Sequence, residues 1–216
     1  MTVPTEDLRE VPTIYPALER IGYDRAFSFE AKHNPFLPLA VASQHTDAMA
    51  LGTAIAIAFA RTPMNLANAG WDLQTITEGR FVLGLGSQIR PHVEQRYGMP
   101  WSRPAARMRE MVLAIRAIWD AWESGGELDF RGEFYTHTLM TPFFTPDPAE
   151  LDGFGPPRVF LAGVGELMTE VAGEVCDGFI CHGFTTEKYL RDVTIPALER
   201  GRAKAGKTME GFEIIG

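Results

Sequence analysis

The chain has 216 residues, a hydrophobic fraction of 45% and a formal net charge of −8 at pH 7. A chain of this length can bury a large core, and it favours one globular domain or at most two. The acidic balance, with no run of Lys or Arg longer than two, argues against nucleic acid or anionic lipid as a partner.

The apolar stretch 51–60 is too short to span a bilayer, and the opening MTVPTEDLRE lacks the basic start of a signal peptide. We therefore expect no membrane partner and a cytoplasmic location. The two cysteines, Cys176 and Cys181, lack CxxC spacing. This favours buried thiols over a redox or metal pair.

Helix and strand patterns alternate through the first 125 residues. The run LGTAIAIAF is continuously apolar and rich in β-branched residues, which predicts a strand buried on both faces. Thr62-Pro63 predicts a helix start, since Thr62 can cap it and Pro63 needs no N–H partner there. Trp119 and Trp122 fall on the apolar face of the last helix and are expected in the core. The expected order is helix 11–21, strand 24–30, helix 35–46, strand 51–59, helix 63–79, strand 81–85 and helix 104–125.

The alternation then breaks and resumes. A hairpin is expected over 128–135 and a proline-rich loop over 136–157, forming an insertion at about 127–157 whose length is typical of a lid. After it we expect strand 158–162, helix 166–176, strand 178–181, helix 187–204 interrupted at Pro196, and strand 212–215. Because strand follows helix throughout, the sheet should be parallel with right-handed crossovers.

These six strands indicate an α/β fold, a (β/α)8 TIM-type barrel that is incomplete. A closed barrel takes about 250 residues, and the pattern shows neither a strand before the first helix nor a helix after the last strand. We expect residues 1–216 to form a single barrel domain. An open sheet would leave edges that need cover.

The first candidate group follows the strand 24–30 and consists of Glu30, Lys32, His33 and Asn34. A carboxylate close to an imidazole can act as a general acid/base pair or hold a heterocycle by hydrogen bonds. The alternative is that Glu30 and His33 only cap the next helix or pair with Lys32.

The second group follows the strand 81–85. Gly84 and Gly86 would let the backbone approach a ligand, and Ser87 offers a hydroxyl beside them, with Arg90 and His92 shortly after. A lone GxG is equally well explained by packing or turn geometry.

The third group is Gly163-Val164-Gly165, a glycine turn that feeds a helix at Glu166. Unpaired N–H groups and the helix dipole favour a phosphate there, and barrels commonly place a phosphate site in such a late loop. The segment lacks the Gly-Lys-Ser/Thr of a P-loop and the third glycine of a dinucleotide motif. Glu166 would compete with a bound anion, and a plain tight turn is the alternative.

The fourth group is Cys181 and His182 at the end of a strand, where His182 either lines the barrel mouth or is a satisfied loop histidine. The five histidines fall on separate loops without metal-ligand spacing, which predicts no metal site. No GxSxG sequence marks a hydrolase.

Taken together, these segments resemble the bacterial luciferase-like monooxygenase superfamily, and more closely its deazaflavin-dependent (coenzyme F420) oxidoreductases. The stretches GRFVLGLGSQ and MTEVAGEVCDGF carry the resemblance most specifically. It implies a barrel whose C-terminal mouth holds a flavin or deazaflavin, with a non-proline cis peptide behind the ring at the end of the third strand, near Ile57, Ala58 and Phe59.

The resemblance also implies roles for the candidate groups. Glu30 and His33 would meet the ring and the substrate, and one of them would supply a proton. The cofactor contacts would come from Ile57, Ala58, Phe59, Ser87, His92, Gly163, Val164, Gly165, Cys181 and His182.

The implied activity is hydride transfer between a deazaflavin and a small organic substrate, in a homodimer, with the loop 136–157 shielding the site from water. One alternative is an FMN-dependent monooxygenase of the same superfamily. The other is a truncated, non-catalytic barrel remnant that acts as a binding or interaction module.

Overall fold

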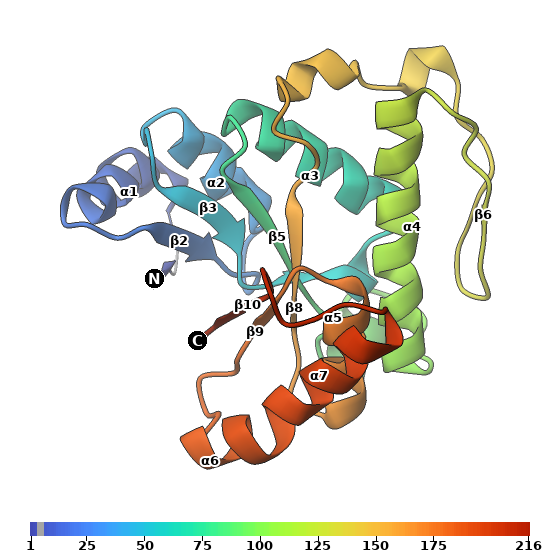
Figure 1. Ribbon diagram of the computed structural model, residues 1–216. Coiled ribbons are helices and arrows are strands. Elements are labelled where there is room, and N and C mark those ends of the chain that lie inside the picture. The colour runs from blue at the N-terminus through green and yellow to red at the C-terminus, as the bar shows by residue number, and fades with distance from the viewer. Residues whose placement is uncertain (4–6) are drawn as a thin grey trace.

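Figure 1 shows the computed structural model, which describes residues 1–3 and 7–216. A curled parallel sheet carries helices on its outer side, so the expected incomplete α/β barrel is confirmed. The strand order is β1-β2-β3-β5-β8-β9-β10, with the short β4 paired to β5. The strands are β1 (Thr2–Val3), β2 (Arg25–Ser28), β3 (Ala50–Thr53), β4 (Ala56–Ile57), β5 (Phe81–Gly86), β8 (Arg158–Ala162), β9 (Gly178–Ile180) and β10 (Glu213–Ile215).

The helices agree closely with the sequence patterns. They are α1 (Val11–Arg20), α2 (Phe36–Ser43), α3 (Pro63–Ile76), α4 (Pro104–Ser124), α5 (Glu166–Val175), α6 (Glu187–Tyr189) and α7 (Ile195–Lys204). Thr62 caps α3 as predicted, because its hydroxyl accepts the N–H of Asn65. The break in the last helical segment is a π-helix over Leu190–Thr194 and does not fall at Pro196. Pro196 lies in the first turn of α7, where its missing N–H has no intrahelical partner to lose.

The expectation that no strand precedes the first helix is wrong. β1 pairs in parallel with β2, with Thr2 opposite Phe27 and Val3 opposite Ser28. Two residues are too few to show a strand period, which is why the pattern missed β1. In the described part of the chain, β1 and β10 each pair with a strand on one side only. Both termini lie near this opening (Figure 1).

The expected strand 51–59 is interrupted. β3 ends at Thr53, a non-proline cis peptide joins Ala54 to Ile55, and β4 then continues into a 3-10 helix over Ala58–Ala60. The cis bond implied near Ile57, Ala58 and Phe59 therefore lies three residues earlier. A continuous apolar run cannot reveal this break, because the residues on both sides of it are equally buried.

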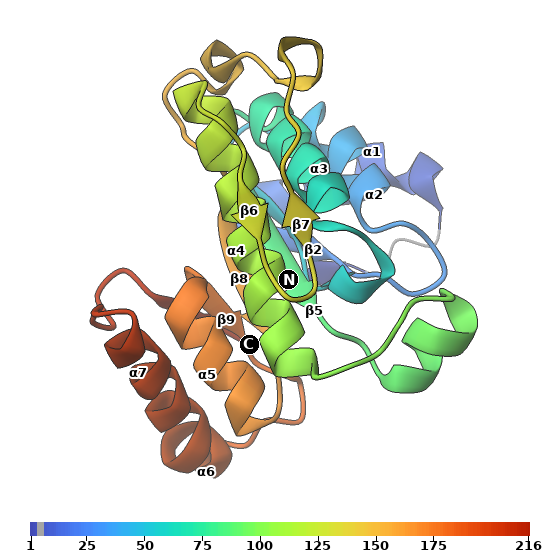
Figure 2. The same cartoon turned by 90° about the vertical axis from the view of Figure 1, so that its right-hand side faces the viewer.

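The insertion begins with the antiparallel pair β6 (Phe130–Arg131) and β7 (Thr136–His137), which runs beside α4 (Figure 2). The rest of the loop lies at the amino ends of the strands. There the Gln74 side chain donates to the carbonyl of Gly155 at 2.9 Å and accepts the N–H of Phe81, the first residue of β5. The loop thus covers the end of the sheet opposite the barrel mouth. The expectation that 136–157 shields the site is wrong, because the connection must return the chain from the end of α4 to the start of β8.

The core confirms the role expected for the tryptophans. Trp119 and Trp122 are buried together with Trp71, and the rings of Trp71 and Trp122 meet edge to face at 5.3 Å. Cys176 is a buried thiol as predicted, and desolvation raises its pKa to about 12. No helix among the described residues has the length and apolar character to cross a bilayer. No set of three or more His, Cys, Asp or Glu residues there could hold a metal ion.

Three charges link opposite parts of the sheet at the amino ends of the strands. Glu213 of β10 forms ion pairs with Arg25 of β2 and Arg158 of β8. The hydrogen bond from Arg25 lowers the pKa of Glu213; desolvation opposes this effect and the hydrogen bond from Arg158 adds to it. The contact joins the first and last parts of the sheet, so it stabilises the curl.

Acid should weaken this link. A carboxylate whose pKa is lower in the folded chain contributes stability above its ordinary pKa of 4.5 and loses it as the pH falls through the folded value. We expect the urea midpoint of the wild type to fall below pH 4.5 more steeply than that of Glu213→Gln, measured side by side. Parallel pH profiles of the two proteins would refute this role.

Candidate active site

Glu30, Ser87 and Gly163 follow β2, β5 and β8 directly or within two residues, so they lie at the same, carboxyl end of the parallel sheet. Functional groups of barrels lie at this end. A cavity of about 520 Å³ also exists at the amino end, but one of about 470 Å³ opens among the carboxyl-end loops. Its lining includes the predicted residues Ser87, Gly163, Val164, Gly165 and His182.

The glycine turn leaves an open space at the start of α5. Gly165 is the N-terminal cap residue, and no side chain caps the helix there. A Cβ added to Gly165 would meet no atom within 4 Å. The first-turn N–H groups of α5 therefore face room for an anion, which the helix dipole favours. Glu166 does not need to oppose such an anion, because its carboxylate lies 2.9 Å from Arg200 of α7.

The connection from β5 to α4 is positively charged. Residues 87–107 contain four arginines and one glutamate, a net charge of +3 in a chain whose total is −8. Arg90 lines the cavity, and its Nε lies 2.9 Å from Glu94. Clustered positive charge at a cleft raises the local concentration of anionic ligands.

Two side chains of the cavity can hydrogen-bond a ligand. Nδ1 of His182 accepts the N–H of Phe184 at 3.2 Å, so the neutral ring carries its hydrogen on Nε2. The Ser87 hydroxyl donates to the carbonyl of Gln88 at 3.1 Å, which leaves its oxygen free to accept. The cavity thus offers a donor and an acceptor beside the glycine turn.

Glu30 forms the centre of a network next to this cavity. Its carboxylate accepts two hydrogen bonds from Arg61, at 2.6 and 2.9 Å, and one from the N–H of Ile57 at 2.8 Å. The hydroxyl of Tyr97 donates to it at 3.3 Å. Only 6% of the Glu30 side chain and 16% of the Arg61 side chain are exposed. This saturated carboxylate joins β2, β4 and the loop after β5.

The other predicted residues do not line the 470 Å³ cavity. His33 is exposed in the loop after β2, and His92 is exposed at the start of the π-helix His92–Arg96. Cys181 lines a different cavity of about 810 Å³, between β2 and β10. Ile57, Ala58 and Phe59 are buried. The roles assigned to these residues stay predictions.

Sequence reasoning missed several residues of the site. Trp101, Pro104 and Met168 line the cavity, and Arg61 and Tyr97 hold Glu30. The three lining residues carry no sequence signal, because apolar side chains in a pocket look like core. Arg61 had one: it is a charged residue directly after an apolar strand, at the end where functional groups gather.

The model of the luciferase-like monooxygenase family matches residues 1–216. The chain belongs to this family. It is 56% identical over 198 residues to the uncharacterized protein Rv1360 of Mycobacterium tuberculosis, covering 92% of this chain and 57% of that one. It is 30% identical over 185 residues to the F420-dependent glucose-6-phosphate dehydrogenase of Beutenbergia cavernae, covering 84% of this chain and 51% of the relative.

Solved structures confirm the fold. An F420-dependent secondary alcohol dehydrogenase superposes with a TM-score of 0.83 at 20% identity, covering 99% of this chain and 65% of that one. The monooxygenase RslO1 of Streptomyces bottropensis superposes with a TM-score of 0.77 at 19% identity, covering 96% and 64%. The chain thus spans between about half and two thirds of the length of these relatives.

Proposed function

We propose that the protein is an oxidoreductase that binds the deazaflavin coenzyme F420 at the carboxyl end of the sheet and transfers a hydride to or from a small organic substrate. The observation that carries this proposal is the meeting of Ser87, Gly163, Gly165 and His182 around one cavity. Family membership and relatives named as F420-dependent support it.

The residues present fit a phosphorylated ring cofactor. Gly165 leaves space that a Cβ would fill, the first turn of α5 has no side-chain cap, and the adjacent loop carries net positive charge. When bound, the deazaflavin supplies the hydride chemistry.

Each part of the site has a task in this proposal. The N–H groups at Gly163–Gly165 and the start of α5 hold the phosphate. Ser87 and His182 orient the cofactor by accepting and donating hydrogen bonds. Glu30 acts as a positioning residue, because Arg61, Ile57 and Tyr97 already occupy its carboxylate. His33, which is exposed, is left as the side chain that moves a proton.

The rival within the family is an FMN-dependent monooxygenase, since structures of monooxygenases share this fold. A phosphate-binding turn serves both cofactors equally well. We also propose a homodimer, as the resemblance implies.

A titration separates these possibilities. We expect the chain to quench the fluorescence of F420 in a saturable way and to bind it about tenfold more tightly than FMN, a difference of about 1.4 kcal/mol. Tighter binding of FMN would favour the monooxygenase. Binding of neither cofactor would refute the proposed function.

A further inference from the structure

One wall of the candidate cavity is formed by Trp101 and Pro104, from the end of the loop after β5 and the start of α4. The ring of Trp101 packs edge to face on Phe59 at 5.7 Å. Arg107, one turn into α4, fixes the backbone next to Trp101 because its Nη1 donates to the carbonyl of Pro100 at 2.8 Å. The wall is thus held from α4.

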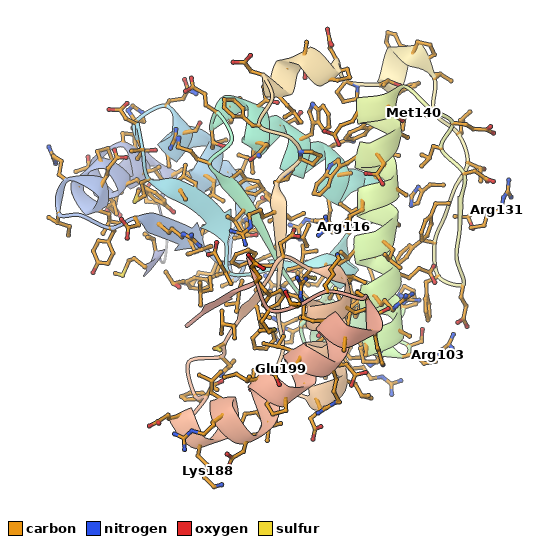
Figure 3. The ribbon with its side chains drawn as sticks, in the orientation of Figure 1. Arg103, Arg116, Arg131, Met140, Lys188 and Glu199 are labelled. Carbon is orange, nitrogen blue, oxygen red and sulfur yellow. The ribbon has the colours of Figure 1, made fainter. Side chains whose placement is uncertain are left out.

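The tip of the β6–β7 hairpin reaches the same wall from outside. The ring of Phe134 lies between two guanidinium groups, 4.8 Å from that of Arg103 and 5.1 Å from that of Arg107. Glu133 adds an ion pair with Arg103. Figure 3 shows Arg103 at the beginning of α4, with the hairpin alongside the helix.

The hairpin tip is fastened firmly to α4. The carboxylate of Glu110 accepts the N–H groups of Glu133, Phe134 and Tyr135 at 2.9, 2.6 and 2.6 Å. Three hydrogen bonds to one charged acceptor fix the backbone of the tip on a rigid helix. Phe134 is therefore placed by contacts that do not involve the cavity.

Both arginines depend on this ring. Arg103 has a φ of +37°, in the left-handed region that residues other than glycine seldom adopt. The buried Nε of Arg107 has no hydrogen-bond partner in the described part of the chain. Its guanidinium is instead placed between aromatic rings, with Phe59 at 6.0 Å on another side.

We propose that Phe134 is a positioning residue for the cofactor site. It does not line the cavity, but it holds Arg103 and Arg107, which carry Pro104 and Trp101. The hairpin at the start of the insertion thereby sets the width of the cavity in which the proposed function places F420, and the inference rests on that function.

The test compares Phe134→Leu with Phe143→Leu, a control at an 89% exposed phenylalanine of the same insertion. Leucine keeps apolar bulk but removes the cation–π contacts. Hydrogen exchange of residues 99–107 is measured without cofactor, and F420 affinity is measured by fluorescence. For Phe134→Leu we expect faster exchange in this segment and about three- to tenfold weaker F420 binding, the effect of losing two partly exposed cation–π contacts. Phe134→Tyr should restore both, and Phe143→Leu should behave as wild type.

The two readouts separate the claims. If Phe134→Leu exchanges residues 99–107 at the wild-type rate, the proposal is overturned whatever the cofactor does. If the exchange rises but F420 affinity does not change, the hairpin does not position the site and the proposal is also overturned. If wild type binds no F420, the proposed function fails, and exchange alone decides whether Phe134 holds the wall.

Discussion

Replacing Glu30 by alanine should lower the free energy of unfolding by about 3–5 kcal/mol, because the change leaves the guanidinium of Arg61 without its carboxylate in a mostly buried position. It also removes the acceptor for the N–H of Ile57 and the hydroxyl of Tyr97. Urea denaturation followed by circular dichroism measures the loss.

A double-mutant cycle tests the reason for this loss. In Arg61→Met the carboxylate of Glu30 loses its counter-charge, whereas Glu30→Ala with Arg61→Met removes both charges. We expect the double variant to be more stable than the sum of the single changes predicts, by more than about 1 kcal/mol. Additive effects, or a loss below about 1 kcal/mol for Glu30→Ala alone, would show that the pair does not hold β2 to β4.

Gly165→Ala should weaken F420 binding by about tenfold or more, equivalent to about 1.4 kcal/mol per tenfold, while the fold persists. The added Cβ would meet no protein atom within 4 Å, and the φ of −87° suits alanine. It would instead occupy the space in front of the first turn of α5. Because glycine is the better N-terminal cap, a stability loss of about 1 kcal/mol is expected as well.

Gly183→Ala is the matched control for this variant. A Cβ there also meets no atom within 4 Å, but Gly183 lines the 810 Å³ cavity instead. Fluorescence titration of both variants gives the comparison. Equal F420 affinities for Gly165→Ala, Gly183→Ala and wild type would show that the glycine turn does not hold the phosphate.

The periodic elements could be read from the sequence because burial on one or both faces imposes a pattern. The strand 158–162 and the start of α4 at Pro104 agree residue for residue with β8 and α4. β1 has only two residues, and the break at Ala54–Ile55 lies inside a run of uniform hydrophobicity. Neither leaves a period to detect.

The candidate site was predictable where chemistry depends on local sequence. The turn at Gly163–Gly165 was found because a glycine pair before a helix start has a local meaning. The partners of Glu30 come from 31 and 67 residues away, and no pattern in one sequence pairs such positions. Trp101 has the same limitation, because its contact with the cavity depends on the path of a loop.

Hydrogen exchange of the wild-type chain with and without F420 tests the central claim most directly, since it shows where the cofactor lies. We expect F420 to slow exchange at residues 86–89 and 163–168, around the 470 Å³ cavity. Protection confined to residues 23–27 and 213–216, beside the 810 Å³ cavity, or no protection at saturating cofactor, would contradict this account.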